Sequence, residues 1–172
     1  MQKVARFEKV SYAQFCADWC DTFPETADDR VRAVYDAIRL PVRATAGSAG
    51  YDFFTPCSIT LAPKQTIKIP TGIRVKIAEG WVLTLYPRSG LGFKYRLQMN
   101  NTVGVIDSDY YGSDNEGHIF AKITNDSNEN KTISLAAGDG FMQGIFLPFG
   151  ITEDDEATAV RNGGFGSTSA KA

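Results

Sequence analysis

The sequence has few of the residues that build metal centres or disulfide frameworks. It contains one histidine and three cysteines, and no two cysteines are spaced as C-x-x-C. Cys16 and Cys20 stand four positions apart, one turn of a helix, a spacing typical of packed thiols. An odd number of cysteines and a lone histidine argue against a zinc site or a disulfide-stapled fold. We therefore expect reduced thiols and a cytoplasmic protein.

Long apolar runs and an excess of positive charge are also missing. No apolar run approaches the ~18 residues that a membrane-spanning helix needs, and residues 1–8 contain no apolar stretch like a secretion signal. The net charge is -2, whereas a protein that binds a nucleic-acid backbone needs a basic face. We expect neither a membrane nor a nucleic acid as partner. The 172 residues fit one domain.

Residues 11–40 have a helical pattern. Ser11 with Gln14 three positions later forms a capping box, and Pro24 ends the helix that it starts. One apolar stripe follows the box at helical spacing: Tyr12, Phe15, Cys16, Trp19 and Phe23. A second helix is predicted from about Ala27 and is closed by Leu40-Pro41. After an opening strand or arm, residues 1–40 are thus predicted to be a helical extension.

The rest of the chain reads as short strands. Alternating or continuous apolar runs bounded by turn residues predict strands over 65–69, 73–77, 81–86, 118–124, 131–135 and 141–149. The polar segment 125–130 is suited to a hairpin loop between two of them. This spacing favours a mainly-β sandwich, barrel or jelly roll. The C-terminal tail is too rich in glycine to hold one conformation alone, because glycine loses most entropy on ordering.

Residues 100–112, NNTVGVIDSDYYG, have the most distinctive pattern. Strand alternation would put Asp107 on the same face as Val103 and Val105, and a carboxylate at the end of an apolar row is costly without partners. Gly104 would leave a gap where another backbone or a ligand comes close. The pattern suits a small-molecule site, but a plain hairpin with turn-forming aspartates explains it as well.

Three other stretches combine glycines with charged or amide side chains. Residues 87–94 follow a strand and combine Arg88 with glycines, which let backbone N–H groups approach an anion. The spacing is not that of a Walker A loop. An ordinary turn is the alternative. Residues 46–52 form a small-residue turn that ends in Asp52, whose simpler role is to pair with an arginine. Gln143 stands near the start of an apolar strand and needs a hydrogen-bond partner if buried.

Taken together and in order, residues 44–52, 87–92, 101–112, 138–143 and 163–168 resemble the five motifs of the trimeric dUTP pyrophosphatases, the dUTPases. The resemblance covers about residues 41–169. It implies a dUTPase-like β jelly roll or β-clip, a homotrimer whose active sites draw on all three subunits, and a last motif that closes as a flexible lid. The implied reaction converts dUTP and water to dUMP and pyrophosphate with Mg²⁺ on the triphosphate. This reaction limits uracil in DNA and supplies dUMP for thymidylate synthesis.

The resemblance also assigns roles to single residues. Asp107 matches the base that deprotonates the attacking water, and Tyr110 matches the tyrosine packed against deoxyribose. Asp52 matches an acid that touches the Mg²⁺ shell through water. The groups that match the binding site of the uracil edge are Asn101, Thr102 and Gly104, and those that match the phosphate ligands are Arg88, Ser89, Gly90 and Gln143. The residues that match the closing lid are Arg161, Phe165, Gly166, Ser167 and Thr168, with Phe165 stacked on uracil.

The sequence departs from the family pattern at three places. Gly140 stands where the family usually has a basic residue after Gly-Asp, the segment between Arg161 and Phe165 is one residue short, and the turn over residues 111–117 is longer than usual. The expected division is a helical extension over 1–40, a catalytic jelly roll over 41–150 and an arm with lid over 151–172. Two alternatives remain. One is a dCTP deaminase of the same fold, and the other is a regulatory protein that binds a partner through its N-terminal helices.

Overall fold

The structure is a computed structural model that describes residues 2–163. Its elements in chain order are β1 (Ala5–Lys9), α1 (Tyr12–Thr22), α2 (Asp28–Ala37), β2 (Val42–Arg43), β3 (Tyr51–Phe54), β4 (Ile59–Leu61), β5 (Thr66–Pro70), β6 (Ile73–Ile77), β7 (Trp81–Pro87), α3 (Ser89–Tyr95), β8 (Leu97–Met99), β9 (Gly104–Ile106), the 3₁₀ helix η1 (Ser108–Gly112), β10 (Phe120–Asn125), β11 (Ile133–Leu135) and β12 (Gly140–Pro148). None of the helices within these residues has both the length and the apolar character to span a membrane.

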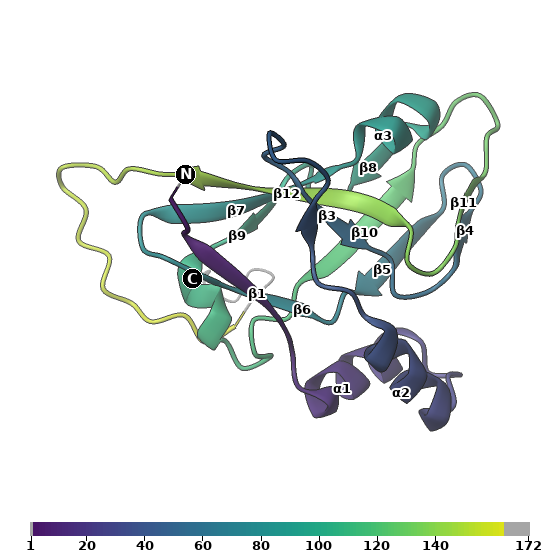
Figure 1. Cartoon of the computed structure of the whole chain (residues 1–172), viewed down its shortest axis with the longest axis horizontal. Helices are drawn as coiled ribbons and strands as arrows, with labels where there is room; N and C mark the ends of the chain where they lie inside the picture. Colours follow the sequence, from purple (N-terminus) through teal and green to yellow (C-terminus); the bar gives the residue numbers. More distant parts are fainter. Residues whose placement is uncertain (1, 164–172) are drawn as a thin grey trace, which may run out of the picture.

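Antiparallel sheets make up most of the regular secondary structure (Figure 1). The largest has the strand order β2-β3-β12-β7-β9, a second has the order β5-β10-β8, and β1-β6 and β11-β4 form two-stranded pairs. Sequential strands are mostly not neighbours, which is how a jelly roll or β-clip differs from a meander. The mainly-β architecture predicted from the sequence is confirmed. As predicted, the apolar run near residue 145 is a buried central strand, since β12 lies between β3 and β7.

The N-terminal helices share one hydrophobic core with the sheets. Phe15 and Val31, from α1 and α2, are fully buried in the same cluster as Phe53, Ile69 and Leu83 of the strands. Strand β1 is also built in, because it pairs with β6 from Ala5 opposite Ile77 onward. The apolar faces of the two helices therefore pack against the strands of the same chain.

The start of α1 has the predicted cap, but only half of the predicted box. The Ser11 hydroxyl accepts a hydrogen bond from the Gln14 amide at 3.1 Å. The Gln14 side chain turns away and donates to Asp18 at 2.8 Å. In its place Glu116, more than a hundred residues later, accepts from the Ser11 amide at 2.7 Å. A distant residue thus completes the cap.

The prediction of a hairpin over residues 125–130 is wrong, because β10 and β11 do not pair with each other. Strand β10 pairs with β5 and β8, whereas β11 pairs with β4. The cause is the buried Asn125, whose amide donates to the carbonyls of Leu61 and Lys131 at 2.8 and 2.9 Å. These two bonds hold the chain after β10 against the end of β4 and direct β11 onto that strand.

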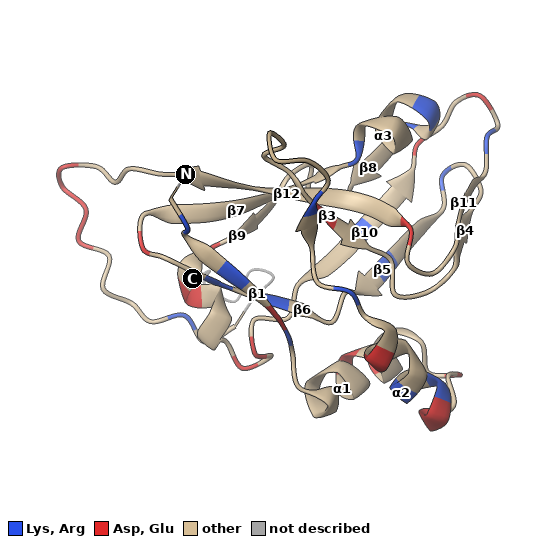
Figure 2. Ribbon diagram, viewed as in Figure 1, with Lys and Arg blue, Asp and Glu red and all other residues tan. Residues whose placement is uncertain are grey.

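The apolar row that the sequence suggested along β9 is not buried in the single chain. Val105 is 58% exposed and Gly104 is buried, so Val105 belongs to an outward face of the single chain. Beyond β12, residues 149–163 form an arm that loops away from the sheet and returns beside η1 (Figure 1). The arm carries the acidic run of residues 153–156, whereas β1 and α2 each carry both basic and acidic residues (Figure 2).

Candidate active site

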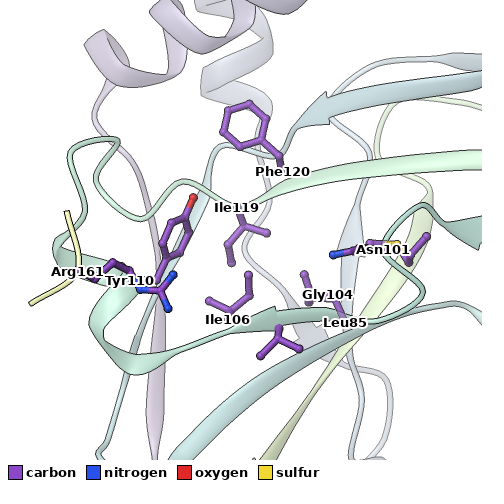
Figure 3. A pocket seen from close by; sticks show the side chains of 10 residues that line it. Leu85, Asn101, Gly104, Ile106, Tyr110, Ile119, Phe120 and Arg161 are labelled. Carbon is purple, nitrogen blue, oxygen red and sulfur yellow. The ribbon is translucent and has the colours of Figure 1, made fainter. Parts of the chain in front are cut away.

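A pocket of about 180 Å³ lies between β7, β9, η1 and the end of the arm (Figure 3). Asn101 stands at one end of it, and Tyr110 and Arg161 stand at the other. Its walls are mostly apolar, with few polar groups, as in most small-molecule sites. The complete lining is Leu85, Met99, Asn101, Gly104, Val105, Ile106, Tyr110, Ile119, Phe120 and Arg161.

The tight turn between β8 and β9 forms one end of the pocket. The Thr102 amide donates to the Met99 carbonyl at 2.9 Å, and the Val103 amide donates to the Asn101 carbonyl at 2.7 Å. Thr102 has a φ of 65°, the left-handed region that tight turns need. A Cβ at Gly104 would lie only 3.0 Å from the Leu85 Cβ. Glycine therefore lets β9 approach β7 closely and brings backbone groups to the pocket wall, as the sequence predicted.

An ion-paired acidic turn closes the other end. Asp107 precedes η1, and its side chain is 46% exposed. The Arg161 guanidinium, from the arm, contacts Asp107 Oδ2 at 2.5 Å and Asp109 Oδ1 at 2.9 Å. The two carboxylates are about half exposed, whereas the Arg161 side chain is 20% exposed. Arg161 therefore occupies an oxygen of Asp107 in the single chain.

Tyr110 is fixed by hydrogen bonds at its hydroxyl. The residue is 6% exposed. Its hydroxyl donates to the His118 carbonyl at 2.8 Å and accepts from the Asn115 amide at 2.8 Å. Burial raises the pKa of the phenol, while the hydrogen bond from Asn115 acts in the opposite direction. The hydroxyl therefore keeps its proton at neutral pH and remains a donor.

A second group of predicted residues meets at the other end of β7. Arg88 Nε lies 3.3 Å from Asp52 Oδ1, the pairing that the sequence suggested. Arg88 also donates to the Gly140 carbonyl at 3.4 Å, and the Gln143 amide donates to the Pro87 carbonyl at 3.3 Å. Ser89 and Gly90 follow at the exposed start of α3, where the sequence left open an ordinary turn. This group is called the Arg88 cluster below.

The Arg88 cluster and Asp107 lie far apart within one chain. Ile106 is opposite Leu83 in the sheet, so Asp107 lies near the level of Val82. Strands advance by ~3.4 Å per residue, which puts Arg88 about 20 Å further along β7. In Figure 1, β9 and α3 accordingly lie at opposite ends of the sheet. The structure brings together Asn101, Thr102, Gly104, Asp107, Tyr110 and Arg161, and separately Asp52, Arg88, Ser89, Gly90, Gly140 and Gln143.

Some predicted residues lie outside the described chain, and some site residues were not predicted. Phe165, Gly166, Ser167 and Thr168 fall outside residues 2–163. The roles of Asn115 and His118 beside Tyr110 were missed. Their signal was present in the unusual length of the turn over 111–117 and in the position of the only histidine directly after it.

The carboxylates do not form a metal site of their own. Within residues 2–163, no three His, Cys, Asp or Glu side chains gather closely enough to hold a metal ion. Asp52 is one carboxylate that already pairs with Arg88. Such a residue suits Mg²⁺ that arrives on phosphate oxygens, because this ion keeps several waters and takes few protein ligands.

Comparisons with known proteins identify the family. The family model described as dUTPase matches residues 36–169. A deoxyuridine 5′-triphosphate nucleotidohydrolase of Lactococcus lactis subsp. lactis is 42% identical over 136 residues, which cover 77% of this chain and 89% of that protein. The crystal structure of the dUTPase from Streptococcus mutans aligns with a TM-score of 0.62 and 33% identity, covering 86% of this chain and 98% of that one.

A phage enzyme extends the likeness in fold. The structure of a mutant dUTPase from phage phi11 of S. aureus, described with a structural Mg(II) ion, aligns with a TM-score of 0.60 and 22% identity over 91% of this chain and 98% of that one. The match of the family model, the identity to the Lactococcus protein and the β-clip agree with one another. The chain belongs to the dUTPase family.

Proposed function

We propose that this chain hydrolyses dUTP to dUMP and pyrophosphate through attack of water on the α-phosphorus. The observation that carries the proposal is the position of Asp107 directly after Ile106 and in contact with Arg161, two residues that line the pocket between the 99–104 turn and Tyr110. A carboxylate beside a mostly apolar hollow that could hold part of a nucleotide is where a general base for an α-phosphate would stand.

Recognition of the base and sugar is assigned to the two ends of this pocket. The Asn101 side chain and main-chain groups of Thr102 and Gly104 pair with the uracil edge. The tight turn that they form would leave no room for the methyl group of thymine. The ring of Tyr110 packs against deoxyribose, where a 2′-hydroxyl would collide. Selection is thus mainly steric.

The chemical step uses Asp107 and the phosphate ligands. Asp107 takes a proton from water, the water oxygen bonds to the α-phosphorus, and the bond to the bridging oxygen breaks so that pyrophosphate leaves with its electron pair. Arg88, Ser89, Gly90 and Gln143 bind the phosphates, joined by Arg161, Phe165, Ser167 and Thr168 when the lid closes. In this closed site fixed donors stabilise the developing negative charge. Arg161 must first release the Asp107 oxygen that accepts the proton.

Mg²⁺ is proposed to bind as part of the substrate. Asp52, which orients Arg88, would hold the ion through a water, and the ion would supply positive charge to the triphosphate. The related phage phi11 enzyme is described with a structural Mg(II) ion, a different role from the one proposed here.

We propose a homotrimer because one chain holds only parts of a site. Asp107 and the Arg88 cluster lie about 20 Å apart along β7. The pocket of about 180 Å³ is also smaller than the ~300–1,000 Å³ of typical ligand sites. Large apolar side chains on the outer face of β9 and on the arm are exposed, among them Val105, Ile151 and Val160. A neighbouring subunit would cover such residues and bring its Arg88 cluster to this Asp107.

We propose three parts of the chain and a cytoplasmic location. Residues 41–150 would be the catalytic jelly roll, 151–172 the arm with its lid, and 1–40 an extension that packs on the jelly roll. A partner that binds this extension would meet its polar faces, since the apolar stripes are buried. A cytoplasmic location suits the three free thiols and a nucleotide substrate.

The test is the release of pyrophosphate from dUTP, dTTP, UTP and dCTP by the full chain, with Asp107→Asn as the matched variant. We expect strong preference for dUTP and a turnover at least ~10²-fold lower in Asp107→Asn, the usual worth of a positioned base. Nucleotide binding should survive in the variant. Ammonia released from dCTP would support the deaminase instead. Near wild-type turnover in Asp107→Asn would remove Asp107 from the role of base.

A further inference from the structure

The long turn after η1 is held by the N-terminal extension. Glu116 accepts hydrogen bonds from the amide and hydroxyl of Ser11 at 2.7 and 2.6 Å. Tyr111 donates to Glu8 of β1 at 2.8 Å. His118, at the end of the turn, contacts Asp18 of α1 at 2.6 Å. Residues of this turn and the histidine after it therefore contact the extension.

Asp18 determines how the His118 ring is oriented. His118 is fully buried, and its Nε2 accepts a hydrogen bond from the Gly72 amide at 2.7 Å. A backbone amide only donates, so Nε2 carries no proton and Nδ1 donates to Asp18 Oδ2. Gly72 has a φ of 72° and no room for a Cβ beside Ile38 and Phe15, so its amide is fixed in place. Asp18 and Gly72 thus hold both sides of the ring.

His118 and Asn115 in turn hold Tyr110. The Tyr110 hydroxyl donates to the His118 carbonyl and accepts from the Asn115 amide, each at 2.8 Å. The oxygen of the same Asn115 side chain accepts from the Gly117 amide at 3.2 Å. A Cβ at Gly117 would lie 2.7 Å from the Tyr110 carbonyl oxygen, so the turn is pressed onto the backbone of η1. A chain of hydrogen bonds therefore runs from α1 to the tyrosine in the pocket.

We propose that Asp18, Asn115 and His118 are positioning residues for Tyr110, through which the N-terminal extension sets the preference for deoxyribose over ribose. The proposal rests on the proposed function, in which the Tyr110 ring excludes a 2′-hydroxyl. Steric exclusion works only if the wall cannot retreat. A phenol fixed by one donor and one acceptor must break hydrogen bonds to move aside for UTP, whereas a ring held only by packing can yield.

The test compares the ratio of kcat/KM for dUTP over UTP in Asp18→Ala, Asn115→Ala and Tyr110→Phe. A ratio of this kind does not depend on the fraction of folded enzyme, so loss of stability alone leaves it unchanged. We expect the ratio to fall ~3- to 10-fold in each variant, the worth of one or two neutral hydrogen bonds. The melting temperature is measured alongside to establish that each variant is folded.

Two further variants serve as controls. Asp21→Ala removes another contact between α1 and the sheets, the ion pair of Asp21 with Lys68 at 3.3 Å. This contact does not involve the turn after η1. The ratio of kcat/KM for dUTP over UTP in Asp21→Ala should therefore equal that of wild type. Asp18→Asn keeps an oxygen that accepts from His118 Nδ1, so it should restore most of the ratio lost in Asp18→Ala. A lower melting temperature with an unchanged ratio in Asp18→Ala would overturn the proposal, because α1 would then only stabilise the fold.

Amide hydrogen exchange without nucleotide separates this proposal from the proposed function. Peptides over residues 108–118 should exchange faster in Asp18→Ala and Asn115→Ala, and at the wild-type rate in Asp21→Ala. If wild type fails to hydrolyse dUTP, the proposed function is wrong, and exchange alone decides whether α1 holds the turn. Equal exchange in all variants would overturn the positioning role even in an active enzyme.

Discussion

The lack of a side chain at Gly140 leaves space that the Arg88 side chain occupies. The family usually has a basic residue here, whereas in this structure the end of the Arg88 side chain fills the space that a Cβ of residue 140 would need. Arg88 reaches over the glycine to its carbonyl and remains paired with Asp52. The Arg88 guanidinium thus lies over residue 140, in a space that a side chain there would need.

Substitution of Gly140 should therefore act on phosphate binding. Gly140→Ala would displace Arg88 Nη1 without adding charge, and we expect KM for dUTP to rise ~3- to 10-fold, less than the full worth of a hydrogen bond to a charged group. Gly47→Ala is the control, because a Cβ there meets nothing within 4 Å. Steady-state kinetics with both variants decides the matter. An unchanged KM in Gly140→Ala would mean that Arg88 does not bind the phosphates in this orientation.

At the scale of elements, the sequence predicted helices and strands that depend on neighbouring residues, but not strand pairings that depend on distant contacts. The Ser11 cap, the two helices and the apolar strand β12 follow from spacing within a few residues. The partners of β10 and β11 depend on Asn125, whose amide reaches Leu61 across 64 positions. The outward side of β9 depends on its packing against Leu85. Alternation predicts that two faces differ, but the neighbouring strand decides which face is buried.

The same distinction applies to the candidate site. Asp107, Tyr110 and Arg88 stood out because their motifs are contiguous in sequence. The bond between Asp18 and His118 joins residues 100 positions apart, and no pattern in the sequence pairs one with the other. Only the folded chain brings them together.

The contact between Ser11 and Glu116 makes the stability of the extension sensitive to acid. Hydrogen bonds from the Ser11 hydroxyl and amide lower the pKa of Glu116, while partial burial acts in the opposite direction. A carboxyl whose pKa is lower in the folded state stabilises the fold above its unfolded pKa of ~4.3, and this contribution is lost as the pH falls through the lower, folded value.

Glu116→Gln should accordingly flatten the acid response. At pH 7 we expect the melting temperature to fall by ~2–4 °C, corresponding to about 1 kcal/mol. Between pH 5 and 3 the variant should lose less further stability than wild type, because its amide does not titrate. Thermal melts across this range measure both effects, with Glu79→Gln in an exposed turn as the control. Parallel pH curves for wild type and Glu116→Gln would contradict the prediction.

At the scale of the whole molecule, the arrangement of site residues decides how subunits cooperate. In the single chain Arg161 contacts the Asp107 of the same chain, while the Arg88 cluster lies about 20 Å away along β7. In the proposed trimer the arm would instead carry its lid to a site whose Asp107 belongs to another subunit. These two arrangements make opposite predictions for mixed assemblies.

The prediction concerns two chains that are each inactive. One carries Asp107→Asn with an intact arm, and the other ends after Val160 with an intact Asp107. If each site takes Asp107 and the lid from different subunits, chains unfolded together and refolded at equal amounts should regain about a quarter of wild-type activity, since random assortment gives that share of sites both parts.

Controls identify where the recovered activity comes from. A chain with both changes, mixed with the Asp107→Asn chain, supplies no intact base and should stay inactive. Sedimentation should show trimers for every mixture, because the residues up to 163 that the truncation removes include none of the hydrophobic core. A mixture that forms trimers yet stays inactive would mean that lid and base act within one chain, as Arg161 and Asp107 do in the single chain. Monomers at micromolar concentration would exclude a site shared between subunits, because no second chain would be present to supply the Arg88 cluster.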